Sequence, residues 1–291
     1  ICHIAAVDKL KNEYSIHIIC KTLGLLKSTY YHRVKRAPEK KWYEIRNEML
    51  RPKILAIFKE SKERFGAQKI SIKLKQQGML VSIDAVSKIM KEMGLVCKQN
   101  RMRKYNTTNK CSKYRKNRLK RNFNPNLPNT FWVSDITYML TSDADCYICV
   151  IMDLFSRKII AYSVSERNDT DLVLTAFNKA FLERGKPANL TFHSDQGTQY
   201  TSYKCRYVLR QSNVLQSFST PGTPYDNAVM ERFIGVMKHE SLSHVYYKNI
   251  DELREGVKEY MEFFNDMRPL EHLGWLTPNE FERRYFEKTA C

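Results

Sequence analysis

The first third of the chain carries apolar residues at helical spacing, and glycines interrupt the pattern. Two short helices are expected over Ile16–Thr22 and Lys27–Val34, separated by Leu23-Gly24-Leu25. A glycine between two short helices lets the chain reverse direction, which is typical of a helix-turn-helix. A generic three-helix core would show the same pattern, so the pattern alone leaves both readings open.

A second helical region follows. A charged helical stretch is expected from about Glu39 to Lys62, with an interruption near Pro52 because proline removes a helix hydrogen bond. Two further helices are expected at Ala67–Gln77 and Ile83–Glu92, the latter capped by Ser82. The apolar residues on one face of the last helix form a buried stripe: Val86, Ile89, Met90 and Met93.

From Phe131 onward the pattern changes to apolar or alternating runs of strand length, divided by helical stretches. The expected strands are Phe131–Leu140, Cys146–Leu154, Lys158–Ser165, Asn189–Ser194 and Val214–Ser219. The expected helices are Asp169–Arg184, Ser202–Gln211, Asn227–Ser241 and Ile250–Phe264. This order, β-β-β-α-β-α-β-α, is the connectivity of the ribonuclease H-like fold. The expected class is therefore α/β, a mixed sheet with flanking helices, preceded by an all-α helix-turn-helix region.

Charge divides the chain in two. Residues 1–125 contain 31 Lys+Arg against 9 Asp+Glu, whereas residues 126–291 contain 18 against 22, so the halves carry +22 and −4. Such asymmetry predicts a front half that binds nucleic acid. Residues 98–121 hold 11 Lys+Arg and no acid, and they read either as a segment that orders on DNA or as a solvated tether. The residues expected to contact DNA here are Tyr30, Arg33, Lys35, Lys88, Lys91, Arg101, Arg103, Lys104, Lys113, Arg115 and Lys116.

The cysteines and the hydropathy predict the compartment. Eight cysteines without a leader or an apolar run near 18 residues indicate a reduced, cytoplasmic, nucleoid-associated protein with no membrane contact. Cys146 and Cys149 form a CxxC pair, but their strand places them on opposite faces, which argues against a redox or zinc site.

Three acidic residues stand where a ribonuclease H-like sheet brings carboxylates together. Asp135 lies in the first strand, within Trp132-Val-Ser-Asp-Ile-Thr-Tyr138, and Asp195 ends the fourth strand in His193-Ser-Asp-Gln-Gly-Thr-Gln-Tyr200. Glu231 lies in the helix after Thr220-Pro-Gly-Thr-Pro-Tyr-Asp-Asn. Carboxylates from separate elements suit two Mg²⁺ (or Mn²⁺) ions acting on a phosphodiester. We therefore expect Asp135, Asp195 and Glu231 to be catalytic metal ligands.

The helix that carries Glu231 is amphipathic. Met230, Phe233 and Met237 share its apolar face, while Asn227, Glu231 and Lys238 share the polar one. We expect Lys238 and Asn227 to contact DNA, although Lys238 also reads as a solvated lysine.

Other polar residues nearby are expected to have structural roles. Asp153 is expected to cap a turn, Asp143 and Asp145 to belong to a hairpin, and Asp226 to cap the helix. His193 either approaches the attacking water or fills space.

These blocks, together with Met152-Asp-Leu-Phe-Ser-Arg-Lys158 and the tail from Phe264 to Phe281, resemble the DDE insertion-sequence transposases, in particular the bacterial insertion-sequence family three. The resemblance covers nearly the whole chain. It implies metal ligation by Asp135, Asp195 and Glu231, DNA contact by Lys238, and nicking at element ends followed by attack of the freed 3′-hydroxyl. The DNA partners would be the terminal inverted repeats and the target, held by a homodimer or larger assembly.

The resulting expected organisation is a helix-turn-helix segment at 1–37, a second helical DNA-binding domain at 38–97, a basic linker at 98–126, an integrase catalytic core at 127–245 and a C-terminal helical tail at 246–291. The family often fuses an upstream frame with a coiled coil to this part. Because the chain shows no heptad run before Asp135 and starts at Ile1, we expect that frame to be absent.

Two other functions fit the same sequence. One is a catalytically inactive DNA-binding regulator of transposition, against which the three intact acids argue. The other is a metal-dependent nuclease that cuts DNA without joining it.

Overall fold

The computed structural model describes residues 6–7, 9–34, 42–98 and 116–289. The first part contains the predicted helix pair, α2 (Ile16–Thr22) and α3 (Lys27–Val34). Gly24 lies between them with φ +64°, a conformation that favours glycine. The pair encloses its own small core around Val7, Ile19, Cys20 and Tyr30.

A second helical unit consists of α4 (Trp42–Glu60), α5 (Ala67–Gln76) and α6 (Ile83–Glu92). Ser82 caps α6 by accepting a hydrogen bond from the backbone N–H of Ala85. The predicted interruption near Pro52 is wrong, because α4 runs through it. Pro52 is exposed, so water can satisfy the one carbonyl that loses its helix partner. The apolar stripe of α6 is buried at Val86, Ile89 and Met90, with Met93 packed against it.

Five strands form one mixed sheet in the order β3-β2-β1-β4-β5. They are β1 (Phe131–Leu140), β2 (Asp145–Asp153), β3 (Ile159–Ser165), β4 (Thr191–Ser194) and β5 (Leu215–Phe218). The first three strands pair antiparallel as the predicted meander, whereas β4 lies parallel to β1 and β5 lies parallel to β4. The parallel pairing with β1 brings the end of β4 towards the middle of β1, and β5 lies on the outer side of β4.

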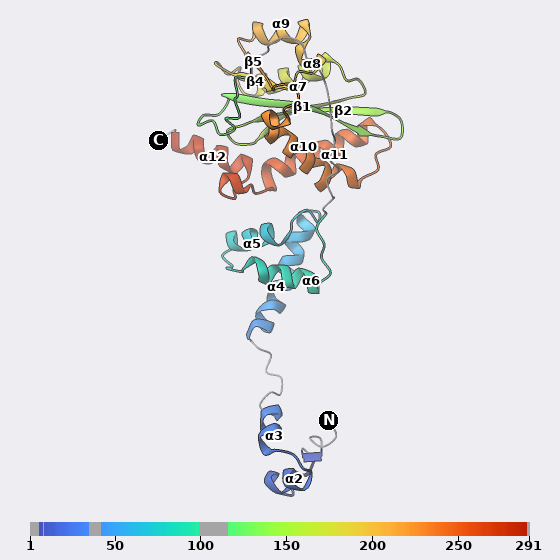
Figure 1. Cartoon of the computed structure of the whole chain (residues 1–291), viewed down its shortest axis with the longest axis vertical. Helices are drawn as coiled ribbons and strands as arrows, with labels where there is room; N and C mark the ends of the chain where they lie inside the picture. Colours follow the sequence, from blue (N-terminus) through green and yellow to red (C-terminus); the bar gives the residue numbers. More distant parts are fainter. Residues whose placement is uncertain (1–5, 8, 35–41, 99–115, 290–291) are drawn as a thin grey trace.

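Helices cover both faces of the sheet, as Figure 1 shows. One face carries α7 (Thr170–Glu183), α8 (Thr198–Thr201) and α9 (Tyr203–Gln211), and the other carries α10 (Ala228–Glu240), α11 (Ile250–Glu262) and α12 (Pro278–Thr289). The short helical turns between them are η1 (Pro224–Asn227), η2 (Leu242–His244), η3 (Phe263–Met267) and η4 (Glu271–Leu273). Cys146 and Cys149 belong to the two separate cores on opposite faces of the sheet, as predicted. The result is the ribonuclease H-like α/β fold that the sequence predicts.

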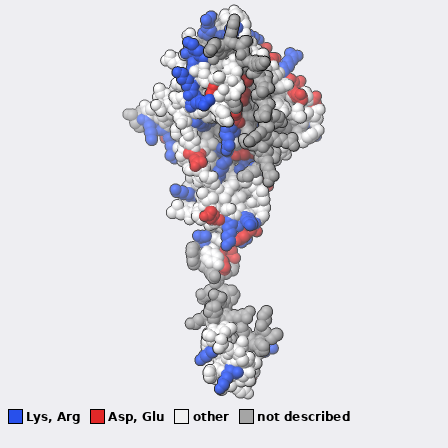
Figure 2. Space-filling view, in the orientation of Figure 1, with Lys and Arg blue, Asp and Glu red and all other residues white. Residues whose placement is uncertain are grey.

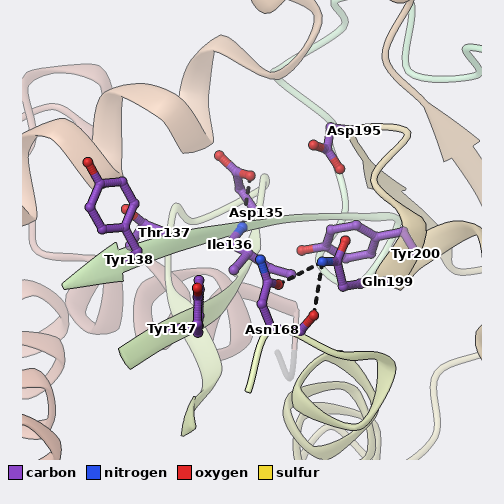
Figure 3. Close-up of a pocket in the computed structure, with 9 residues that line it drawn as sticks. All are labelled: Asp135, Ile136, Thr137, Tyr138, Tyr147, Asn168, Asp195, Gln199 and Tyr200. Carbon is purple, nitrogen blue, oxygen red and sulfur yellow. Dashed lines mark hydrogen bonds between the residues drawn. The ribbon is translucent and has the colours of Figure 1, made fainter. Parts of the chain in front are cut away.

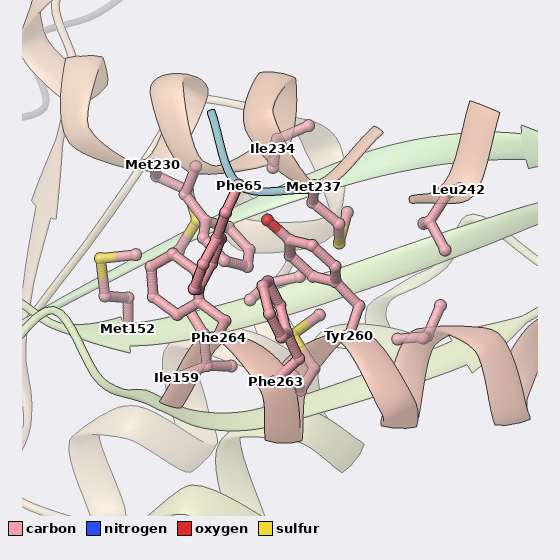
Figure 4. Packing of buried hydrophobic residues seen from close by; sticks show 14 of the residues in the cluster. Phe65, Met152, Ile159, Met230, Ile234, Met237, Leu242, Tyr260, Phe263 and Phe264 are labelled. Atoms are coloured by element: carbon pink, nitrogen blue, oxygen red, sulfur yellow. The ribbon is translucent and has the colours of Figure 1, made fainter. Parts of the chain in front are cut away.

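The helical unit α4–α6 shares a core with the α10–α11 side of the sheet. The ring of Phe65 lies 5.8 Å from that of Phe263, and Figure 4 shows Phe65 among Met230, Tyr260 and Phe264. Phe65 is 2 % exposed, so its ring is buried between the two units.

Candidate functional site

Strand pairing brings two of the predicted acids side by side. Val133 of β1 pairs with His193 of β4 in parallel register. Asp135 and Asp195 each stand two residues further along their chains, so they reach the same level of the sheet on the same face. Figure 3 shows both carboxylates projecting to one side of β1.

The two carboxylates line a cleft of about 170 Å³. Its wall also contains residues that the sequence analysis did not single out, among them Asn168, Gln199 and Tyr200. The Gln199 Nε2 donates to Asn168 Oδ1 at 2.8 Å, and the Tyr200 hydroxyl lies 2.8 Å from Ser134 Oγ. Gln199 and Tyr200 belong to the quoted block after Asp195, whereas Asn168 lies in a loop without any motif, so no sequence signal identified it.

Backbone amides hold each carboxylate in place. Asp135 Oδ1 accepts from the N–H of Ile136 at 2.8 Å, and Asp195 Oδ1 accepts from the N–H of Gly197 at 2.9 Å. A Cβ atom at Gly197 would stand 3.1 Å from Asp195 Oδ1 and 2.9 Å from Gln199 Oε1. A side chain at this position would therefore crowd the Asp195 carboxylate and require the Gln199 amide to move.

The site carries surplus negative charge. Burial raises the pKa of Asp135 to about 7, and the nearby charges of Asp195 and Glu231 add to this, while the Ile136 N–H and Lys238 oppose it. Loss of solvent also raises the pKa of Asp195 and of Glu231. Oxygen donors with uncompensated charge are the ligands that divalent magnesium and manganese prefer.

Glu231 stands apart from this pair. It is exposed on α10 and acts on Asp135 electrostatically, but it does not line the cleft. Within the described parts of the chain, no three Asp, Glu, His or Cys side chains approach closely enough to share a metal ion. The structure thus brings Asp135 and Asp195 together, and the donor set fits a divalent ion in its chemistry, with Glu231 nearby on a separate helix.

Lys238 is tied to β1. Its Nζ donates to the carbonyl oxygen of Tyr138 at 2.7 Å and lies 4.6 Å from the centre of that ring. Burial lowers the pKa of Lys238, and the charge of Asp135 works against this. The ammonium group therefore lies at the edge of the acidic site and keeps donors for a further partner.

Asn227 does not lie on the surface as expected. It is 4 % exposed, and its Nδ2 donates to the backbone oxygen of Ser134 at 3.2 Å. This hydrogen bond joins the start of α10 to β1, one residue before Asp135. The DNA contact expected of Asn227 is corrected to this positioning role, because a side chain so enclosed has no surface to offer.

Two further sequence expectations are decided by burial. His193 is fully buried, with Nδ1 and Nε2 2.8 and 3.1 Å from the hydroxyl oxygens of Ser217 and Ser219. Burial lowers the pKa of His193 to about 4, so the neutral ring fills the sheet interior away from the cleft. Asp153 caps its turn as predicted, accepting from the N–H groups of Asn129 and Phe155.

Asp226 does not cap α10 as expected. Its carboxylate instead accepts from the Thr220 N–H, the Asn117 amide and the Arg121 guanidinium at 2.8–2.9 Å. Asp226, a buried acid just before α10, thus joins Asn117 and Arg121 to the loop that contains Thr220.

Among the residues of the front half that are predicted to contact DNA, some are exposed, one is buried and the others lie outside the described residues. Lys88, Lys91 and Lys116 are exposed. Tyr30 is 2 % exposed inside the core of the first helix pair, so the contact expected of it is corrected to a packing role. The remaining residues, including the Arg33 side chain, lie outside what the structure describes: Arg33, Lys35, Arg101, Arg103, Lys104, Lys113 and Arg115.

The fold and the acidic cleft define an α/β protein with an integrase-type core behind helical units. Family profiles agree: the integrase core domain matches residues 125–224, a second integrase core profile matches 212–278, and an HTH-like domain matches 44–103. Among solved structures, the chain is similar to the HTLV-2 integrase catalytic core domain in complex with magnesium. That likeness has a TM-score of 0.42 and 18% identity over 52% of this chain and 94% of that one.

Curated relatives span nearly the whole chain. The chain is 34% identical to the insertion element IS600 uncharacterized 31 kDa protein of Shigella sonnei, over 94% of this chain and all of that one. It is 35% identical to the transposase for insertion sequence element IS904 of Lactococcus lactis, over 85% and 98%. It is also 30% identical to the transposase InsF for insertion sequence IS3A of Escherichia coli, over 96% and 97%. The chain belongs to this family of insertion-sequence transposases, as its sequence motifs predicted. No helix in the described ranges is long and apolar enough to cross a membrane.

Proposed function

We propose that this protein is a transposase that nicks DNA at the ends of an insertion sequence and joins the freed 3′-hydroxyl to a second phosphodiester. The observation that carries the proposal is the pairing of Asp135 and Asp195 in one cleft, where burial, with the charges of Asp195 and Glu231 adding to it, raises the pKa of Asp135. Family membership supports the same reaction class.

In this proposal Asp135, Asp195 and Glu231 hold two Mg²⁺ or Mn²⁺ ions. Bound in this way, the ions supply an activated attacking oxygen and a stabilised leaving oxygen. The Ile136 and Gly197 amides keep the two aspartates aimed into the cleft before DNA arrives. Rigid placement of this kind is what gives a reacting group its effective concentration.

Other side chains position the DNA. Lys238, fixed between the Tyr138 carbonyl and the edge of the acidic site, is placed to contact a phosphate beside the scissile bond. The Asn227 amide locks the start of α10 to β1, which sets the distance from Glu231 to Asp135. Lys88, Lys91 and Lys116, together with the basic segment, supply phosphate contacts away from the reaction.

Two element ends must be held at once, so the active form is at least a dimer on DNA. The mass of the active complex, measured by light scattering, tests this, and a monomeric active complex would exclude it.

One assay distinguishes the candidate functions. The protein is incubated with labelled element-end DNA and Mg²⁺ or Mn²⁺, and nicked and joined strands are separated on denaturing gels. Both products are expected. Nicking without joining would identify a nuclease instead, and binding without either product would identify an inactive regulator.

A further inference from the structure

Helix α9 presents two aromatic rings to solvent. Tyr203 and Tyr207 stand one helical turn apart and are 76 % and 52 % exposed. Their ring centres are 6.1 Å apart and the ring planes differ by only 21°, so they form a stacked pair on the surface. The opposite face of the helix is anchored in the core by Cys205 and Leu209. The rings are therefore held on a rigid support.

These rings border a groove of about 510 Å³ between α9 and the edge strand β5. Arg206 and Arg210 join them from the helix, and Leu215 and Gln216 line the other side. No Asp or Glu is among the residues that line the groove. Its surface thus combines flat aromatic rings with positive charge.

The groove adjoins both the acidic cleft and the basic segment. The helix α9 follows directly after Gln199 and Tyr200 of the cleft wall, and Gln216 Nε2 donates to the Tyr200 carbonyl at 3.1 Å. At the other end of β5, the Phe218 N–H donates to the carbonyl of Lys116. Figure 2 shows Lys and Arg side chains gathered at the end of the molecule that carries α9.

We propose that the groove between α9 and β5 binds an unpaired DNA strand, with bases stacked on Tyr203 and Tyr207 and phosphates against Arg206 and Arg210. Proteins that bind single-stranded DNA without sequence preference combine aromatic rings, on which bases stack, with a positively charged groove that holds the phosphates. In a duplex each base face is covered by the neighbouring base pair, so only unpaired bases can stack on the tyrosine rings. The expected ligand is therefore a strand that leaves the cleft unpaired. The inference rests on the proposed function only in taking DNA as the ligand.

A protein partner is the competing occupant, because Tyr and Arg are also enriched at protein interfaces. A lining with two arginines and no carboxylate favours a polyanion over a protein of mixed charge. The hydrogen bond between Gln216 of the groove and Tyr200 of the cleft wall favours the DNA on which that cleft would act.

Binding of the full chain to a fluorescent single strand and to a duplex of equal length, in EDTA, tests the inference. Replacing both Tyr203 and Tyr207 with Ala should weaken single-strand binding by at least about 25-fold, since each of the two stacked bases contributes about 5-fold or more. Duplex binding should change by less than about 2-fold. The Tyr203→Phe, Tyr207→Phe protein keeps both rings and should bind like wild type. Tyr246→Ala, which removes an 80 % exposed tyrosine elsewhere, is the matched control.

Two more readouts separate the outcomes. A strand carrying 5-iodouracil should cross-link under ultraviolet light to Tyr203 or Tyr207. Changing Arg206 and Arg210 to Gln should flatten the dependence of log affinity on log salt by about 1.4 for two lost contacts. Unchanged single-strand binding by the double Ala protein, or cross-links only elsewhere, would overturn the inference while leaving cleavage activity to support the proposed function. If the double Ala protein binds the single strand like wild type but self-associates less, the groove is a protein interface instead.

Discussion

Asp135 is the residue on which the acidic site depends. Burial raises its pKa to about 7, and the charges of Asp195, just after β4, and of Glu231 on α10 add to this. A cation of two charges would relieve this repulsion, whereas a single proton relieves it only in part. If this site holds a divalent ion as proposed, protons and the ion would compete for it.

Divalent-ion binding should strengthen as the pH rises to about 7 and then become constant. Below that pH Asp135 is protonated and the ion must displace the proton, whereas above it the carboxylate is already free. Calorimetric titration with Mn²⁺ between pH 5.5 and 8.5 measures this. Asp143→Asn, at an exposed hairpin position, should keep the profile, while Asp135→Asn should lose it. A pH-independent affinity in the wild-type protein would contradict the assignment.

Asp226 is a buried acid with a structural role. Burial alone would raise its pKa, but hydrogen bonds from Arg121 and Thr220 outweigh this and lower the pKa to about 2. An unfolded Asp titrates near 3.9. The stabilisation is therefore complete above about pH 5 and is lost as the pH falls towards 2.

Asp226→Asn should lower the free energy of unfolding by about 1–3 kcal/mol at neutral pH, since charged hydrogen bonds of a buried group are lost. The free energy of unfolding of this variant should also fall less steeply than that of the wild-type protein between about pH 5 and 2. Urea unfolding across this range measures both effects. Equal acid sensitivity in the two proteins would show that Asp226 is not a source of acid unfolding.

Sequence reasoning found side chains that follow from strand position and missed those that depend on the loops between elements. Asp135 and Asp195 could be predicted to meet because a ribonuclease H-like sheet brings the end of the fourth strand towards the middle of the first. Asn168 was missed because its place in the cleft depends on the loop before α7. Asn227 and Tyr30 were assigned to DNA from their places on predicted helices, and only tertiary packing shows that they are buried.

At the scale of elements, α10 and α11 each contain a glycine, and the two glycines differ in the space that a side chain would find. A Cβ at Gly256 of α11 would stand 2.5 Å from the hydroxyl oxygen and 2.7 Å from a ring carbon of Tyr247, which is 4 % exposed. A Cβ at Gly235 of α10 would meet nothing within 4 Å. Helix propensity alone favours alanine at both positions by up to about 1 kcal/mol.

Gly235→Ala should therefore stabilise the protein by about 0.5–1 kcal/mol, whereas Gly256→Ala should destabilise it by about 1–3 kcal/mol. The second change forces the buried ring of Tyr247 to move, and that cost exceeds the gain in propensity. Thermal unfolding of the two variants gives the comparison. Stabilisation by both would mean that α11 does not pack against Tyr247 as described.

The predicted elements agree with the structure where local signals are strong. The bounds of α2, α3 and α6 follow from apolar spacing and a cap, and the three-stranded meander follows from alternation and short turns. Pro52 was misread because a proline at an exposed helical position costs one hydrogen bond without ending the helix. The pairing of β1 with β4 connects strands far apart in sequence, which only the recognised connectivity predicted.

At the scale of the whole molecule, one buried arginine joins the helical unit α4–α6 to the integrase core. The Arg64 side chain is 5 % exposed and donates to the Glu240 carbonyl, the Ser241 hydroxyl and the Glu259 carboxylate. Its guanidinium also lies 4.6 Å from the centre of the Phe263 ring. The helices before the basic segment are thus fastened to α10 and α11, on the side of the sheet that carries Glu231.

Arg64→Ala should lower the free energy of unfolding by about 3 kcal/mol and separate the unfolding of the two units, because it leaves buried acceptors unpaired. Limited proteolysis should then release the integrase core more quickly. Lys62→Ala removes only an exposed pair with Glu259 and should change stability by less than about 1 kcal/mol. Equal effects of the two variants would show that the units are not joined through Arg64.

The most direct test of the central claim is the rate of strand joining by Glu231→Gln, because Glu231 is the acid that the structure leaves outside the cleft. The substitution keeps the size and polarity of the side chain and removes its charge. If Glu231 completes the metal site, joining under single-turnover conditions in Mg²⁺ should fall on the order of 10³-fold, while DNA binding and thermal stability remain unchanged. Full joining activity in Glu231→Gln, with none in Asp135→Asn, would contradict the three-acid site.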